Sequence, residues 1–388
     1  MTAALVTGEG RGYEDAAAEA RRRWGGLLDD VGKDAPRRYA EGTALPREAF
    51  RRAAEEGLTG YALPPRVGGG GAGPGAWGRT QQELGRLCAD PVFPMLVGVQ
   101  AGIAGVLAAA GDDGLDERWV RPIVAGACVP ALAFSEDADL FSMRTRIRPD
   151  GAGFRLDGRK EFVGGGLTAD VFLVYAAAPG GDLVACLVDA GDPGVRVEPV
   201  TGLGFATGAS ARLLMADVPI AADRIVAPVD GLSHAQRFLN TRRIDIACTV
   251  AGQMRTLLDR AVERLRVTER HGRLLIDLPN VQAALGRMSM GVVTAHAVTG
   301  HALRHIESGR LQPGFDPVVA TAKHQVTAAA LALVEEAFRV LGGHAYYGDP
   351  HFAMAVREFH GLVAGSGTQE HLEINLGVHA AHTPGGAG

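Results

Sequence analysis

The chain has 388 residues, 47% of them hydrophobic, with a formal net charge of −5 at pH 7 and a sequence pI near 6.2. This length exceeds what one hydrophobic core normally serves, so two or three domains are expected. The slightly acidic balance excludes the basic surface with which proteins bind nucleic acid or anionic membranes.

Four cysteines lie far apart and form no CxxC pair, so we expect no zinc site and no disulfide framework. They are interpreted as buried free thiols in a reducing cytoplasm. The N-terminal stretch carries charge early and lacks a continuous apolar core, so no signal peptide is expected. No window approaches about 18 uninterrupted apolar residues, so no spanning helix is expected either. We therefore predict a cytoplasmic protein. The cysteines are Cys88, Cys128, Cys186 and Cys248.

The first region, to about residue 127, is predicted to be helical. Residues 14–28 and 47–56 are rich in Ala, Arg and Glu, and their apolar positions recur every three to four residues. A Pro/Gly-rich loop at residues 63–71 interrupts the helical pattern. We assign residues 1–129 to an N-terminal helical domain.

The glycine-rich loop formally contains G-x-G-x-x-G at Gly68, Gly70 and Gly73. A dinucleotide-binding fingerprint needs a strand before the glycines and a helix after them. Here the loop follows two prolines and lies between predicted helices. We interpret the motif as accidental.

The pattern changes to period two between residues 130 and 232, which predicts a middle β domain. Residues 154–156 read as a strand that runs into a turn at Asp157-Gly158. Further short strands are predicted at residues 171–175, 183–188 and 211–214.

Helical periodicity returns in residues 233–388 and predicts a C-terminal helical bundle. The strongest candidates are residues 242–267, 281–308 and 317–341. Gly342-Gly343 follows the third of them as a predicted C-cap.

Three short stretches near the C-terminus occur in a fixed order: residues 341–346 read LGGHAY, residues 357–360 read REFH, and residues 366–370 read SGTQE. Their order and spacing resemble the C-terminal signature of the acyl-CoA dehydrogenase family, LGG-x-G-[FY], then RDA, then [YF]-E-G-T. Residues 60–69, 156–163 and 217–219 resemble three further segments of that family.

The resemblance implies an α+β fold with an N-terminal helical domain, a middle β-barrel-like domain and a C-terminal four-helix bundle. It also implies FAD as cofactor and an acyl thioester as substrate. The family completes its flavin site across a subunit interface, so a homodimer or a homotetramer (a dimer of dimers) is expected. An electron-transfer partner or a flavin reductase is the implied redox partner.

Four positions correspond to residues that contact the flavin ring in the family. Phe134 and Ser135 occupy the place of a T-E-P-G stretch, where the Ser135 hydroxyl would bond the ring edge; a surface turn is the alternative. Phe162 and Gly164 stand where the family has W-I-[ST]. The aromatic ring is retained, but the hydroxyl that bonds flavin N5 is lost at Gly164, where a backbone N–H remains. A core role for Phe162 is the alternative.

The diphosphate end of FAD would meet a segment that the family writes R-x-x-F-G. Here Thr268 holds the Arg position and His271 the Phe position. Arg270 and Arg273 flank them as candidate substitutes, and exposed arginines that bind only water are the alternative. Loss of a bidentate Arg weakens diphosphate binding. FAD held less tightly, FMN, or a diffusing reduced flavin are all compatible with this change.

Gly342 and Gly343 match the turn that approaches the adenosine side of FAD, and a helix C-cap is equally compatible with them. Thr368 matches a flavin-contacting Thr of the family. Glu370 replaces the usual Gln and adds a negative charge near a diphosphate.

The catalytic base is the main departure from the family. Ser366 stands where the family has Glu, and a neutral hydroxyl cannot remove an α-proton without its own base. Arg242 stands at the alternative Glu position on the first bundle helix. Asp245 lies about one helical turn from Arg242 and is our tentative base, with an ion pair as the alternative. His360 and Glu136 are weaker candidates.

Three functions remain open. The first is a flavin-dependent oxidoreductase on a CoA- or carrier-protein-linked acyl thioester, with a non-standard base and a role in specialised metabolism. The second is a flavin-dependent monooxygenase on the same fold, which needs no α-proton base. The third is a non-catalytic subunit or scaffold paired with an active homologue.

Overall fold

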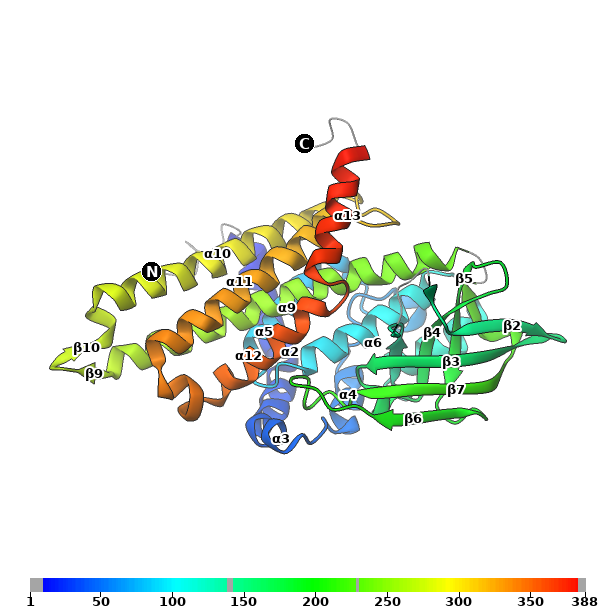
Figure 1. The fold of residues 1–388 in the computed structure, drawn as a ribbon, viewed down its shortest axis with the longest axis horizontal. Coiled ribbons are helices and arrows are strands. Elements are labelled where there is room, and N and C mark those ends of the chain that lie inside the picture. The colour runs from blue at the N-terminus through cyan, green and yellow to red at the C-terminus, as the bar shows by residue number, and fades with distance from the viewer. Residues whose placement is uncertain (1–9, 138–141, 228–229, 383–388) are drawn as a thin grey trace. The chain divides into compact units, whose positions relative to one another are not determined.

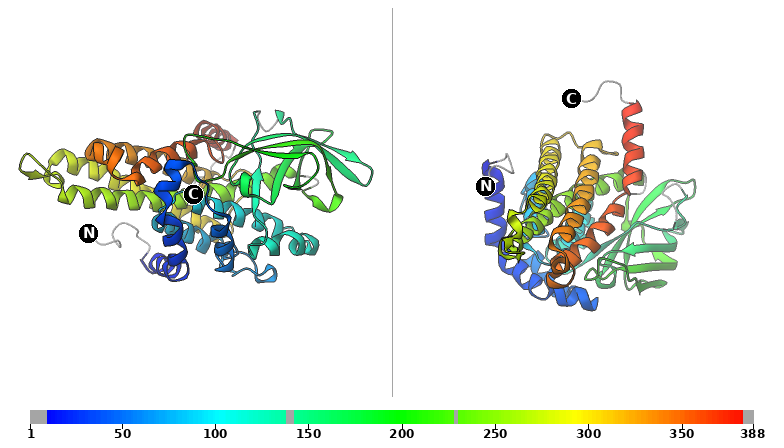
Figure 2. Two further views of the ribbon diagram at one scale, coloured as in Figure 1. Left: turned by 90° about the horizontal axis from the view of Figure 1, so that it is seen from below. Right: turned by 60° about the vertical axis from the view of Figure 1, so that its left-hand side comes forward.

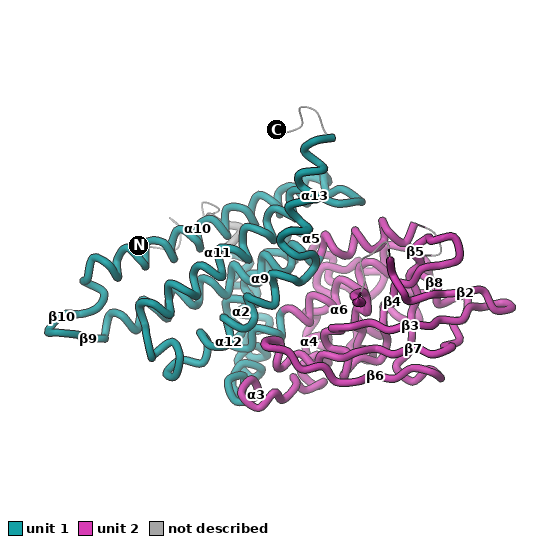
Figure 3. Tube along the Cα trace, in the orientation of Figure 1, with its two compact units in different colours: residues 1–37, 74–94, 242–388 teal, residues 38–73, 95–241 magenta. Residues whose placement is uncertain are grey.

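The computed structural model describes residues 10–137, 142–227 and 230–382 (Figure 1). Within these residues helices come first, a β-sheet follows and long helices end the chain, which confirms the predicted α+β class. The chain divides into two compact units (Figure 3). One comprises Met1–Arg37, Pro74–Pro94 and Arg242–Gly388, and the other comprises Arg38–Gly73 and Met95–Thr241.

The N-terminal region is helical, as its periodicity predicted. The glycines after Val67 follow a 3₁₀ turn instead of a strand, and a Cβ atom at Gly69 would lie 2.2 Å from the Leu63 carbonyl oxygen. These glycines therefore allow a tight turn, and the G-x-G-x-x-G match is accidental. The elements are α2 (Gly10–Lys33), α3 (Ala35–Glu41), α4 (Arg47–Glu55), η1 (Pro65–Val67), α5 (Gly73–Leu87), α6 (Phe93–Ala108), α7 (Asp113–Leu115), η2 (Asp116–Val120) and α8 (Arg121–Val124).

The middle region forms an eight-stranded sheet in the order β6-β7-β3-β2-β4-β5-β8, with β1 parallel to β4. Apolar side chains from β3 and β7 share one buried cluster with side chains from β4 and β5, so the sheet curves around its own core. The strands are β1 (Pro130–Ala133), β2 (Arg146–Asp150), β3 (Gly153–Val163), β4 (Val171–Ala177), β5 (Leu183–Asp189), β6 (Val195–Pro199), β7 (Ala211–Ile220) and β8 (Ile225–Ala227).

The turn predicted at Asp157-Gly158 is wrong, because β3 continues through it to Val163. Gly158 lies at φ +150° where the register with β7 shifts, and a Cβ atom there would lie 2.6 Å from Thr145 Cα. Asp-Gly ordinarily indicates a turn, but here the glycine accommodates a β-bulge.

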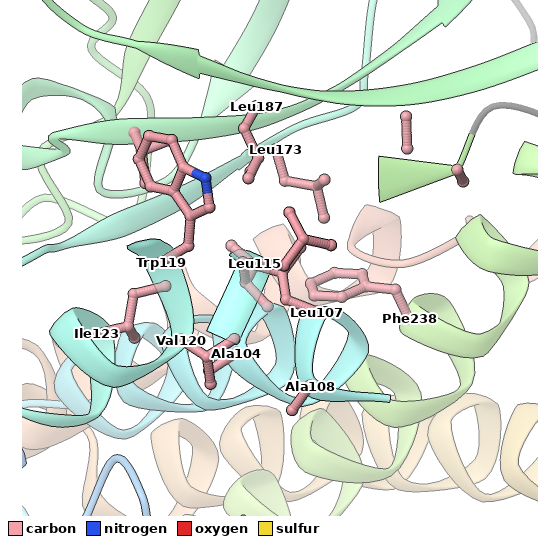
Figure 4. Packing of buried hydrophobic residues seen from close by; sticks show 14 of the residues in the cluster. Ala104, Leu107, Ala108, Leu115, Trp119, Val120, Ile123, Leu173, Leu187 and Phe238 are labelled. Atoms are coloured by element: carbon pink, nitrogen blue, oxygen red, sulfur yellow. The ribbon is translucent and has the colours of Figure 1, made fainter. Parts of the chain in front are cut away.

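A second buried cluster covers the opposite face of β4 and β5 (Figure 4). Leu173 and Leu187 from these strands face Leu107 of α6, Trp119 of η2 and Phe238 (Figure 4). Burial of each large apolar side chain contributes roughly 1.5–3 kcal/mol. This packing fixes β4, and through it β1, whose carboxyl end leads into Phe134 and Ser135.

The C-terminal region is helical, and the predicted bounds of the third long helix are confirmed. The first helix begins at Gly231 instead of 242, because buried Ala235 and Phe238 extend its apolar pattern backwards. The elements are α9 (Gly231–Val267), β9 (Glu269–Arg270), β10 (Arg273–Leu274), η6 (Leu275–Asp277), α10 (Pro279–Glu307), α11 (Pro317–Leu341), η7 (His344–Gly348), α12 (Pro350–Ala364) and α13 (Gln369–His382).

Helix α11 lies at the centre of this helical region. It packs against α10, α12 and α13, and α10 and α11 run side by side in the views of Figures 1 and 2. Its length and composition would allow it to cross a membrane, but half of its apolar window is buried inside the protein. A bundle-core helix passes the same test, so its hydropathy is accounted for by packing.

Candidate active site

The segment after β1 is held by a buried lysine. Lys160 of β3 has no exposed surface, and its Nζ donates to the Phe134 carbonyl oxygen at 3.1 Å and to Glu136 Oε1 at 2.7 Å. The Glu136 carboxylate also accepts the backbone N–H groups of Arg144 and Thr145, at 2.6 and 3.2 Å. Glu136 therefore links the segment after β1 to the backbone of Arg144 and Thr145 and to Lys160 of β3.

Burial alone would raise the pKa of Glu136, but the Lys160 hydrogen bond and charge outweigh it, so the pKa lies below its ordinary value. Burial lowers the pKa of Lys160, against the opposing effect of Glu136. The distance of 2.7 Å between Lys160 Nζ and Glu136 Oε1 is typical of a charge-assisted hydrogen bond. A carboxylate bonded in this way anchors the backbone, and the weaker candidacy of Glu136 as a base has no geometric support.

Phe134 and Ser135 lie at the carboxyl end of β1, as the predicted flavin-edge residues. The Ser135 carbonyl oxygen accepts Glu161 N–H at 2.8 Å, and its side chain is exposed. The Phe134 ring meets Tyr175 edge-on at 5.1 Å, and Tyr175 Oη bonds His234 Nδ1 at 2.8 Å. The Ser135 hydroxyl is thus presented on a backbone fixed from two sides.

Phe162 is 73% exposed and has φ +56°, so the alternative of a core role for it is wrong. An exposed aromatic ring in a left-handed conformation is an uncommon arrangement that is open to a planar ligand. At Gly164 a Cβ atom would lie 3.0 Å from Phe205 Cε1. The Phe205 ring therefore takes the room that a Ser or Thr side chain would need at position 164.

Ser366 lies in the turn between α12 and α13, at φ +56° and half-buried. Its carbonyl oxygen accepts Arg243 Nε at 3.2 Å, and Lys323 Nζ donates to the carbonyl oxygens of Val363 and Gly367 at 2.9 and 2.8 Å. Two buried cations thus hold the backbone of this turn.

Thr368 follows that turn at the start of α13. Its side chain is exposed, and its Oγ1 accepts His371 N–H at 3.2 Å. His360 is exposed on α12 and bonds the Val356 carbonyl oxygen of its own helix. Glu370 is exposed. Burial lowers the pKa of Lys323, and the negative charge of Glu370 partly opposes that effect.

Asp245 forms a buried ion pair with Arg242. Its Oδ2 lies 3.0 Å from an Arg242 guanidinium nitrogen, and its Oδ1 accepts Trp77 Nε1–H of α5 at 3.0 Å. Burial raises the pKa of Asp245 to about 6, against the attraction of Arg242. Both oxygens are engaged within the helices, which favours the ion-pair alternative; the base role stays a prediction.

Positions predicted for the diphosphate and for the adenosine side of FAD line one cavity of about 430 Å³. Thr268, Arg270, Gly342 and Gly343 all line it, whereas His271, at φ +51° in the β9–β10 turn, does not. Gly342 adopts φ +54° and ψ −130°, a conformation that favours glycine. The sequence-predicted glycines and Arg270 are therefore neighbours.

Two further arginines line this cavity that the sequence analysis did not predict as site residues. Arg264 lies one turn before Thr268 on α9, and Arg339 lies in the last turn of α11. Their helical spacing from Thr268 and from Gly342 was the available signal. With Arg270 they supply three guanidinium groups, which suits a diphosphate.

The chain matches the models of the acyl-CoA dehydrogenase N-terminal domain (residues 18–127), middle domain (133–218) and C-terminal domain (229–379). It belongs to the acyl-CoA dehydrogenase family. It is 27% identical over 316 residues to cyclohex-1-ene-1-carbonyl-CoA dehydrogenase of Geobacter metallireducens. The aligned region covers 79% of this chain and 82% of that protein.

Another relative is 3-(aryl)acrylate reductase of Clostridium sporogenes, 23% identical over 89% of this chain and 90% of that protein. Among solved structures, FkbI, for biosynthesis of the methoxymalonyl extender unit of a polyketide, has a TM-score of 0.83. It is 26% identical and covers 92% of this chain and 99% of its own. Members of the family are flavoprotein oxidoreductases, and its homologues bind FAD, one of them being solved with FADH2.

Proposed function

We propose that this protein is an FAD-dependent oxidoreductase acting on a CoA- or carrier-protein-linked acyl thioester in specialised metabolism. The arginine- and glycine-lined cavity is the observation that supports this proposal most, because positions expected to meet the diphosphate and the adenosine side of FAD both line it. When bound, FAD would supply a two-electron acceptor. The likeness to FkbI, a protein of polyketide extender-unit biosynthesis, supports a specialised role.

We propose that FAD is held by the three cavity arginines in place of the Arg lost at Thr268. Guanidinium groups bind phosphate oxygens in bidentate geometry and stay charged at any physiological pH. Ser135 and Phe162 would meet the flavin ring, the first through its exposed hydroxyl and the second through its exposed aromatic face. Thr368 and the backbone N–H of Gly164 complete the proposed set.

A second cavity, of about 630 Å³, supports the proposal that the acyl thioester is carried on an arm that bears phosphate. Arg146 and Arg148 line it together with Gly180 and Gly181 of the β4–β5 loop. Arg146 bonds backbone carbonyl oxygens and, among the residues that the structure describes, has no carboxylate partner. Phosphopantetheine of CoA or of a carrier protein supplies a suitable anion.

The candidate functions differ in whether they need a catalytic base. Ser366 and Arg242 are not acids, and Asp245 is engaged by Arg242 and Trp77. These observations favour, as a second candidate, a flavin-dependent monooxygenase supplied by a flavin reductase, since such chemistry needs no α-proton base. A non-catalytic subunit is the third candidate, and it requires no bound flavin.

We also propose a homodimer or a dimer of dimers. Apolar side chains are exposed on α10, on α13 and after α11, and a second copy would cover them. They are Met290, Val293, Tyr346, Tyr347, Ile374 and Val378.

Ser366→Glu tests the leading proposal. The variant and the parent protein are mixed anaerobically with a panel of acyl-CoA thioesters while the visible absorption of the flavin is recorded. Flavin bleaching that appears or accelerates in Ser366→Glu supports an intact acyl site around position 366. Bound flavin without bleaching in either protein, but with an oxygen-dependent product once a reductase is added, would support the monooxygenase instead.

A further inference from the structure

Lysine is rare in this chain, and its positions are informative. Of 39 basic residues only Lys33, Lys160 and Lys323 are lysines. Lys33 is exposed, whereas Lys160 and Lys323 have no exposed surface. Lysine is among the residues least often buried, so a buried lysine in a chain that otherwise uses arginine indicates a specific requirement.

Lys323 has no ion-pair partner among the residues that the structure describes, and it binds backbone instead. Its Nζ lies 2.9 Å from the Val363 carbonyl oxygen, within the last turn of α12, and 2.8 Å from that of Gly367. The last carbonyl groups of a helix lack intrahelical partners and carry its negative dipole end. The Lys323 ammonium group therefore donates hydrogen bonds both to a terminal carbonyl group of α12 and to a carbonyl group of the turn that follows it.

The intervening residue is held by a second cation. Arg243 Nε donates to the Ser366 carbonyl oxygen at 3.2 Å, and its guanidinium lies 5.2 Å from the centroid of the Phe315 ring. Three carbonyl groups of one five-residue turn are thus bound by two buried cations from α9 and α11. Ser366, at φ +56°, lies between the two attachment points of Lys323.

We propose that Lys323 is a positioning residue, whose buried ammonium fixes the turn 363–367 and with it the direction in which the residue at 366 faces. The inference rests on the proposed function only in taking position 366 as the one that faces the thioester. Ser366 stands where the family signature has Glu, so the side chain whose direction Lys323 fixes is a hydroxyl in this chain.

A compact ammonium suits this location better than a guanidinium. It offers three donors around one atom, whereas the planar fork of arginine is larger and presents its donors in one plane. Burial, together with the charge of Arg243, lowers the pKa of Lys323 to about 8, and Glu370 of α13 partly opposes this. Lys323 therefore remains mostly protonated at pH 7.

The test uses amide hydrogen exchange of the full chain with FAD added. Lys323→Gln and Lys323→Arg are compared with the matched changes Lys33→Gln and Lys33→Arg at the exposed lysine. The reporter amides are Gly365, His371 and Leu372, whose N–H groups donate to the Gly361 carbonyl oxygen, Thr368 Oγ1 and the Thr368 carbonyl oxygen.

Both Lys323 variants are expected to exchange at least about tenfold faster at these amides, with α10 unchanged, because only the local opening equilibrium shifts. The Lys33 variants should match the parent protein throughout. Unchanged exchange at the turn would overturn the proposal. A uniform rise across α9–α11, or loss of folding in both Lys323 variants, would equally overturn it, because Lys323 would then serve the whole fold.

A kinetic readout separates positioning from binding. In anaerobic stopped flow with butyryl-CoA, Lys323→Gln should lower the limiting rate of flavin reduction about tenfold while the half-saturating concentration changes less than threefold. A raised half-saturating concentration at an unchanged limiting rate would contradict a positioning role. If the parent flavin is not reduced by thioesters, the proposed dehydrogenation fails, whereas the exchange result still decides the role of Lys323.

Discussion

Lys160→Met should strongly destabilise the protein, because it leaves Glu136 buried without its counter-ion. The side chains of both residues are almost fully buried, with 2.7 Å between Nζ and Oε1. Removing one partner of a buried ion pair typically costs about 3–5 kcal/mol. Two backbone N–H groups still bond Glu136, so we expect about 3 kcal/mol, the lower end of that range.

The assay is denaturant unfolding at pH 7 with FAD present. Lys33→Met, at the exposed lysine, is the control and should stay within about 0.5 kcal/mol of the parent protein. Adding Glu136→Gln to Lys160→Met should recover much of the loss, because no unpaired charge remains buried.

The stability lost in Lys160→Met should also depend on pH, in a direction that the pKa of Glu136 determines. Without Lys160 the pKa of Glu136 should rise above its unfolded value, so the loss should shrink as the pH falls towards 4. A loss below about 1 kcal/mol at pH 7, or one independent of pH, would refute the reasoning.

Arg264→Glu should weaken FAD binding at least about tenfold in a fluorescence titration, whereas Arg266→Glu, two residues further along α9 and outside the cavity, should not. Asp245→Asn should cost about 3–5 kcal/mol of stability by leaving Arg242 unpaired; a normally stable variant that loses about a hundredfold in rate would instead establish the base. Burial lowers the pKa of His234 to about 4, below its unfolded value, so its contribution to stability is lost as the pH falls from 6.5 to 4. His234→Gln should therefore reduce the stability lost between pH 7 and 4.5 by about 2 kcal/mol, and an unchanged pH profile would contradict this.

The sequence predicted the order of helices and strands because periodicity reports which face of each element is buried. The bounds of α11 were predicted well, since Asp316 and Pro317 begin it and Gly342 ends it. Local rules failed where tertiary packing overrides them. Asp157-Gly158 indicated a turn, but contact with Thr145 and the neighbouring strand made it a bulge within β3.

The site was predicted only in part. The family signature predicts site roles for Gly342, Gly343 and Ser366, which stay predictions, but no motif indicated that buried lysines bind the backbone of two of the predicted segments. Hydrogen bonds to carbonyl groups distant in sequence leave no local pattern. Lys323 and the Val363 carbonyl oxygen, for example, are 40 residues apart. The one available signal was the scarcity of lysine itself.

We propose above all that the protein uses FAD to oxidise an acyl thioester. The most direct measurement is an anaerobic titration of the purified, FAD-saturated protein with acyl-CoA and acyl-carrier-protein thioesters, monitored by visible absorption. We expect a bound flavin spectrum that bleaches on addition of at least one thioester and returns with an electron acceptor. Protein that retains no flavin after incubation with excess FAD would contradict it.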